Sequence, residues 1–146
     1  MAITRIGILG YFWSNCNSKL WSLWSSNKIG DALSFVGSVL AIWLSLRIAA
    51  ATRASNEFGI LAKILASGFG LIVLASTWMR MTNGLNNWII ASNNLNALED
   101  KSETAKGFVE YVGTTEIATT PTPMGIAFLV IVGLMILIQI WAPKSN

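Results

Sequence analysis

Apolar residues gather in three stretches of the chain, each long enough to cross a lipid bilayer as a helix. A transmembrane helix needs about 20 mostly apolar residues, because each residue rises ~1.5 Å through a hydrocarbon core ~30 Å thick. The three stretches are residues 29–51, 58–79 and 124–142. Few residues separate the first two, so we expect residues 29–79 to form an antiparallel helical hairpin. The sequence therefore predicts an all-α integral membrane protein with three transmembrane helices.

Residues 1–28 carry tryptophans mixed with lysines and serines. The amphipathic rings of Trp13, Trp21 and Trp24 suit the headgroup region of a bilayer. We interpret this part of the chain as an interfacial segment lying on the membrane. The alternative is that the same rings pack against the protein's own helices or a neighbouring subunit. At the end of the third stretch, Trp141 is expected to anchor the last helix at an interface.

Residues 80–123 separate the second and third stretches, and their first part is amphipathic. Apolar residues recur at spacings of three and four over 85–98, which predicts a helix with one apolar face and one asparagine-rich face. The same pattern returns over 105–112 and stops at Gly113, an expected C-cap. Two paths fit this pattern: the second membrane helix continues unbroken to Gly113, or it bends near Gly84.

A threonine- and proline-rich linker, residues 114–123, leads to the third helix. Thr122 is its expected N-cap, and Pro123 suits the first helical position because its missing N–H has no helical partner there. Large aliphatic residues predict that this helix faces lipid over most of its surface. Gly125 and Gly133, eight residues apart, mark a candidate contact line.

Three charged residues near the ends of the first two stretches have structural reasons to be there. Asp31 lies in the first turn of the predicted first helix, where the positive end of the helix dipole favours a carboxylate. Arg47 lies in the last turn of that helix, and its long side chain reaches the headgroups. Lys63 lies about one turn into the second helix and reaches the headgroups likewise. We interpret all three as positional charges.

Stripes of small residues on the first two helices predict close helix packing. Small residues at every fourth position let helix backbones approach, which is how helices associate inside a bilayer. The first helix also carries a second stripe, Gly30, Ser34 and Ser38, available to another subunit. The predicted packing positions are Gly37, Ala41 and Ser45 on the first helix and Ala62, Ala66 and Gly70 on the second.

Composition restricts the possible functions. Only 12% of the residues are charged, against roughly a quarter in soluble domains. The net charge of +3 is too small for a nucleic-acid-binding surface, so no nucleic-acid partner is predicted. The chain has no histidine and one cysteine, Cys16, which removes the usual ligands of haem and zinc. We therefore expect neither a cofactor nor a metal.

The best candidate for a catalytic pair is Lys63 with Ser67, four residues apart on one helical face. A desolvated lysine can serve as a base for a serine nucleophile. Against this, no further catalytic group accompanies the pair, and Lys63 lies where its charge reaches the headgroups. We expect that the protein is not an enzyme.

The distribution of basic residues favours a cytoplasmic N-terminus. With three crossings, residues 1–28 and 80–123 lie on one side of the membrane and carry six of the ten lysines and arginines. The hairpin turn and the short tail, residues 143–146, lie on the other side. Cytoplasmic segments carry an excess of Lys and Arg.

These features predict a non-catalytic structural subunit of a larger oligomeric membrane assembly, such as a secretion, conjugation, viral or bioenergetic complex. Its expected partners are the lipid bilayer and other membrane subunits or copies of itself. The alternative is a homo-oligomeric pore- or lesion-forming protein of the holin or channel type. In that alternative, the basic residues of the hairpin line water.

Overall fold

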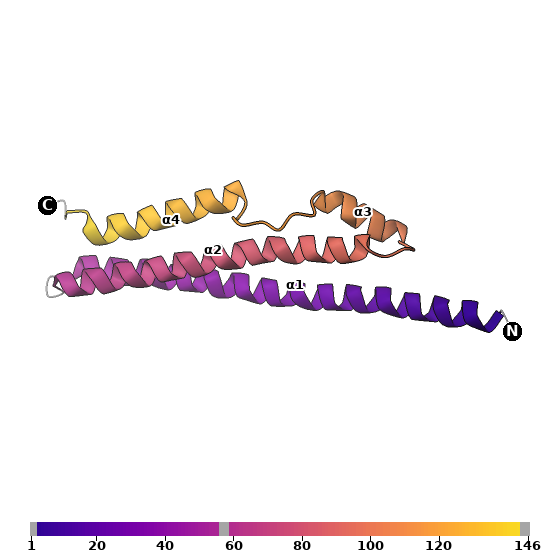
Figure 1. Cartoon of the computed structure of the whole chain (residues 1–146). Helices are drawn as coiled ribbons and strands as arrows, with labels where there is room; N and C mark the ends of the chain where they lie inside the picture. Colours follow the sequence, from indigo (N-terminus) through magenta and orange to yellow (C-terminus); the bar gives the residue numbers. More distant parts are fainter. Residues whose placement is uncertain (1–2, 56–58, 144–146) are drawn as a thin grey trace. The chain divides into compact units, whose positions relative to one another are not determined.

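The protein is all-α. The computed structural model describes residues 3–55 and 59–143, with side chains from residue 18 onward apart from Leu20. Within these residues, four helices follow one another: α1 (Ile3–Ala54), α2 (Ile60–Asn96), α3 (Glu103–Val112) and α4 (Pro123–Trp141) (Figure 1). None of the described residues forms a strand. The predicted fold class is confirmed.

Three of the helices are long and apolar enough to span a membrane, over Trp21–Ala54, Ile60–Asn96 and Pro123–Trp141. The 19 residues of α4 extend ~28 Å, close to the ~30 Å of a hydrocarbon core. The 37 residues of α2 extend ~55 Å, and the 52 residues of α1 extend ~78 Å. Both α1 and α2 are therefore much longer than the hydrocarbon core is thick.

The first helix is continuous from Ile3 to Ala54, with no helix boundary near residue 28. The physical reason is that this part of the chain holds no helix breaker: all three prolines lie beyond residue 120, and the glycines stand singly. An isolated glycine costs a helix only about 1 kcal/mol relative to alanine. Asp31 consequently lies in the middle of α1, and its predicted place in a first helical turn is wrong.

The second helix stays helical through Gly84 and ends at Asn96, so an unbroken path to Gly113 is wrong. A new helix begins because the hydroxyl of Ser102 accepts a hydrogen bond of 3.2 Å from the backbone N–H of Ala105. At its other end, Gly113 adopts a φ of 66°, which glycine reaches without steric cost. The predicted C-cap is confirmed.

The ends of α4 also follow the predicted signals. The hydroxyl of Thr122 accepts a hydrogen bond of 3.2 Å from the N–H of Gly125, and Pro123 is the first helical residue. The helix ends at Trp141, two residues before Pro143. Both predicted start positions of this helix are confirmed.

The chain folds into two compact units. Unit 1 comprises residues 1–32 and 84–117, and unit 2 comprises residues 33–83 and 118–146. Unit 1 joins parts of α1 and α2 to α3 through aromatic rings. In unit 2, parts of α1 and α2 pack with α4 around an aliphatic core. Its buried members are Ile42, Ala49, Ala66, Val73, Val132, Ile136 and Ile140.

Candidate functional site: helix-packing surfaces

In unit 2, helices α2 and α4 approach closely at glycines. A Cβ atom placed on Gly70 would lie 2.9 Å from Cγ2 of Ile136, so Ile136 occupies the space beside the glycine. At Gly133 the roles are exchanged: the glycine is on α4 and the large side chain is on α2. A Cβ atom placed on Gly133 would lie 3.2 Å from Cδ1 of Leu74. Each helix thus offers a small residue to a large neighbour, which lets the two backbones approach.

Helix α4 buries one stripe, and most of its other residues are exposed. Its candidate contact line is confirmed: the Cβ position of Gly125 lies 3.1 Å from Sδ of Met81, and Gly133 contacts Leu74. The exposed remainder is available to lipid. The buried stripe consists of Leu129, Val132, Ile136 and Ile140, at spacings of three and four.

The six predicted packing positions have different surroundings. Three are buried (Ser45, Ala66 and Gly70), two are half-buried (Ala41 and Ala62) and one, Gly37, is exposed. A Cβ atom on Gly37 would meet nothing within 4 Å. Because the close neighbour of Gly70 is Ile136 of α4, the spacing of small residues does not by itself identify which helix uses each stripe.

The buried hydroxyl groups of unit 2 form hydrogen bonds within their own helices. Each donates a hydrogen bond of 2.8–3.0 Å to the carbonyl oxygen four residues earlier. A buried hydroxyl without a partner would cost free energy, and this local bond removes that cost while the side chain stays small. The residues are Ser38, Ser45, Thr52, Thr77 and Thr82, each at most 9% exposed.

At one end of unit 2, Trp141 of α4 contacts two polar side chains in the first turns of α2. Its indole N–H donates a hydrogen bond of 3.0 Å to Oγ of Ser67. The Nζ of Lys63 lies 5.7 Å from the centroid of the Trp141 ring, within cation–π range. Arg53 donates a hydrogen bond of 3.3 Å to the carbonyl oxygen of Pro143. Lys63 and Ser67 therefore both serve the attachment of α4.

Arg47 is exposed, with its guanidinium 5.9 Å from the ring centroid of Trp43. Its predicted place in the last helical turn is wrong, because α1 continues to Ala54. The contact with Trp43, four residues earlier on the same face, is the local partner that the structure shows for this charge.

Unit 1 is held by aromatic rings from three helices. Trp24 of α1 meets Trp88 of α2 and Phe108 of α3 edge to face, at centroid distances of 5.5 Å and 5.6 Å. Trp88 stacks on Phe108 at 5.6 Å, and Trp21 and Tyr111 extend the cluster. Aromatic pairs of this kind contribute about 0.5–1.5 kcal/mol each beyond their burial. We call these five residues the aromatic cluster.

The aromatic cluster bears on one of the two interpretations of the N-terminal tryptophans, which do not exclude each other. Trp21 and Trp24 pack against rings of α2 and α3, which confirms the alternative that they contact the protein's own helices. Their position at a membrane interface stays a prediction. The side chains of Trp13 and Cys16 lie outside the described residues.

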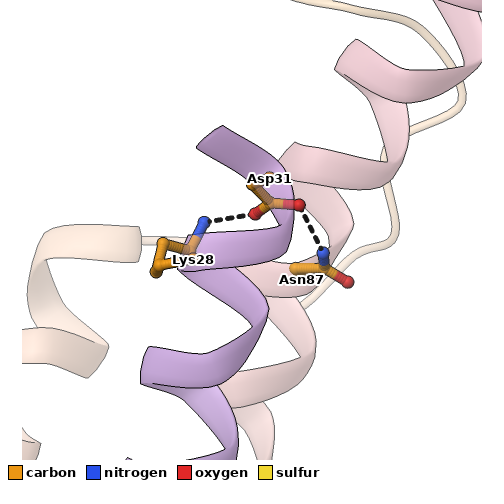
Figure 2. A network of polar contacts seen from close by, with 3 residues as sticks. All are labelled: Lys28, Asp31 and Asn87. Atoms are coloured by element: carbon orange, nitrogen blue, oxygen red, sulfur yellow. Dashed lines mark hydrogen bonds and ion pairs between the residues drawn. The ribbon is translucent and has the colours of Figure 1, made fainter. Parts of the chain in front are cut away.

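Lys28, Asp31 and Asn87 form a polar network (Figure 2), and Lys28 links this network to the aromatic cluster. The Nζ of Lys28 lies 2.8 Å from Oδ2 of Asp31, one turn along α1. Asn87 of α2 donates a hydrogen bond of 3.3 Å to the other carboxylate oxygen. Lys28 also lies 4.7 Å from the ring centroid of Trp88 and 5.9 Å from that of Trp24. Asp31 is thus placed by an ion pair and an inter-helix hydrogen bond.

Part of this network has a sequence signal that our prediction did not use. Trp24, Lys28 and Asp31 follow one another at spacings of four and three, which places them on one face of a helix. Asn87 carries no comparable signal, because it is one of several asparagines along the polar face of α2.

No group of three or more metal-ligating side chains occurs within the described part of the chain. The chain matches no protein-family model, and no curated protein or solved structure shows significant similarity to it. The helix contacts themselves are therefore the features that bear on its function.

Proposed function

We propose that this chain is a non-catalytic structural subunit of a larger membrane assembly. The observation that carries the proposal is the use of the five buried hydroxyls of unit 2, which donate to backbone carbonyls of their own helices. Small side chains with internally bonded hydroxyls allow close helix packing inside a membrane. Their O–H groups already donate to the backbone, so they are not free to donate to a substrate.

The contacts within each unit support three membrane crossings. In unit 1, the part of α1 before residue 33 packs against residues 84–117, and three crossings put these two segments on the same side. In unit 2, Arg53 before the hairpin turn bonds to Pro143 after α4, again on one side. Two independent sets of contacts thus agree with the same topology.

Unit 2 exposes large apolar side chains. This exposure supports a location of unit 2 among lipid and other membrane helices. Leu33, Phe35 and Leu40 of α1 are 70%, 65% and 60% exposed, and Ile72 of α2 is 67% exposed. Apolar surface on this scale marks a membrane or protein interface. The open position at Gly37 leaves room for a close neighbour on the same surface.

A homo-oligomeric pore is the second candidate function. The exposure of Arg47 and Arg80 on the two helices of the hairpin favours it, because charged side chains can line a water-filled passage. A pore requires copies of this chain alone, whereas a structural subunit requires other proteins beside it.

The mass and composition of the solubilised particle test the proposal. We expect the full chain, extracted from its native membrane in mild detergent, to purify in a particle that contains other membrane proteins in fixed ratios. Reconstituted alone in liposomes, the chain should not release an entrapped dye. A closed particle of this chain alone that releases the dye would replace the structural role with the pore.

A further inference from the structure

A groove of about 210 Å³ lies between α1 and α2 on the surface of unit 2. Its floor consists of Ser38, Val73 and Thr77, which are at most 9% exposed. On the α1 side the wall is open at Gly37, where a Cβ atom would meet nothing within 4 Å. Since the floor hydroxyls of Ser38 and Thr77 already donate to their own helices, the groove presents a mainly apolar surface.

One cation stands on the α2 side of this groove. Ile72, Ser76 and Arg80 line it at spacings of four, so they share one face of α2. Ion pairs among the described side chains join Lys28 to Asp31 and Lys106 to Glu103, and none of those side chains supplies Arg80 with an acidic partner. The guanidinium is exposed and available to an anion.

The depth of Arg80 in the bilayer follows from the next residue, Met81, which contacts α4. Met81 contacts Gly125, in the first turn of α4, and α4 is the helix whose length matches the hydrocarbon core. Arg80 therefore lies at the level where the hydrocarbon ends and the headgroups begin. From there, Ser76 and Ile72 lie one and two turns deeper along α2.

We propose that this groove binds an anionic phospholipid, with its phosphate on Arg80 and one acyl chain along Gly37 and Ile72. A guanidinium forms paired hydrogen bonds to a phosphate, and basic pockets between membrane helices hold anionic headgroups. Ser76, an exposed residue, lies one turn below that headgroup position. This lipid site stands independently of the proposed structural role.

Arg80 favours a lipid over a second copy of the chain in this groove. An apolar helix covering the groove would remove water from the guanidinium without supplying a counter-charge, which is costly. A lipid phosphate supplies that charge and leaves the acyl chain to fill the apolar part.

Binding of defined lipids to the full chain in mild detergent, followed by native mass spectrometry, tests the site. We expect dioleoylphosphatidylglycerol to bind more tightly than dioleoylphosphatidylcholine. Arg80→Gln should weaken phosphatidylglycerol binding about tenfold, the effect of losing one charged hydrogen-bonding partner. Gly37→Leu should weaken both lipids by filling the groove, and Ser76→Leu fills it from α2 if Gly37→Leu does not fold.

Two matched variants provide the controls. Arg47→Gln removes another exposed arginine, and Gly68→Leu enlarges another glycine with open space around it, so both should leave binding unchanged. Equal losses in Arg47→Gln and Arg80→Gln would overturn the site, because they would show diffuse attraction of anionic lipid. Unchanged binding in both groove-filling variants would overturn it too, as would disulfide-linked dimers of Gly37→Cys in a Cys16→Ser background.

Discussion

At the scale of single residues, Gly70 and Gly68 differ sharply although they lie two positions apart on α2. A Cβ atom on Gly70 would come within 2.9 Å of Ile136, whereas one on Gly68 would meet nothing within 4 Å. The difference arises because successive small residues point in different directions around a helix, and only Gly70 points at α4.

We therefore expect Gly70→Leu to lower the free energy of unfolding by about 1–3 kcal/mol, the usual cost of overpacking a filled site. Gly68→Leu should not lower it, because its Cβ position is open and leucine favours a helix more than glycine does. Thermal unfolding of the detergent-solubilised chain, followed by circular dichroism, provides the comparison. Equal destabilisation by both substitutions would contradict the contact between α2 and α4.

Lys63 is expected to act through its charge and not as a base. Lys63→Arg keeps a cation beside Trp141 and should preserve stability and assembly, whereas Lys63→Met should cost about 0.5–1 kcal/mol through the lost cation–π contact. Unfolding curves and particle mass measure both effects. If Lys63→Arg and Ser67→Ala each abolish the biological activity of a normally assembled particle, the pair is catalytic.

At the scale of helices and their ends, local chemistry was enough to predict some boundaries and not others. Thr122 with Pro123 and the glycine at 113 act through their own backbone geometry, so their neighbours in sequence reveal them. The end of α2 at Asn96 could not be predicted from its neighbours in sequence, because the apolar spacing of residues 85–98 continues past Asn96. The start of α1 was also missed, since a polar, aromatic segment without a breaker can continue a membrane helix.

Helix α3 is short, and its ring Phe108 attaches it to the rest of unit 1. Phe108 contacts Trp21, Trp24 and Trp88, whereas Tyr111 is 78% exposed and contacts Trp88 alone among the described rings. Losing several ring pairs at about 0.5–1.5 kcal/mol each exceeds what an isolated ten-residue helix can tolerate.

Phe108→Ala should therefore release α3, with amide hydrogen exchange in Glu103–Val112 rising at least about tenfold, the equivalent of 1.4 kcal/mol. Tyr111→Ala is the matched control and should change exchange much less. Hydrogen exchange measured by mass spectrometry on the solubilised chain follows both variants. Comparable exchange in the two variants would show that the aromatic cluster does not hold α3.

At the scale of the whole molecule, the apolar pattern predicted the fold class because a bilayer requires each crossing to satisfy its own backbone hydrogen bonds. The pattern could not assign the packing stripes, since Gly37 and Gly70 have the same local spacing yet one is open and the other faces Ile136. Such differences depend on the register between helices, which the sequence of one helix does not contain. The Asp31–Asn87 hydrogen bond illustrates the same point, because it joins residues 56 positions apart.

The three-crossing topology underlies the proposed function and the lipid site alike, and cysteine accessibility in intact membranes tests it most directly. In a Cys16→Ser background, Ala54→Cys reports the side of the hairpin turn and Thr104→Cys reports the side of α3; both positions are exposed. We predict that a membrane-impermeant thiol reagent, applied from one side, labels only one of the two variants and labels the other after the membrane is opened. Labelling of both variants from the same side would contradict the three-crossing arrangement.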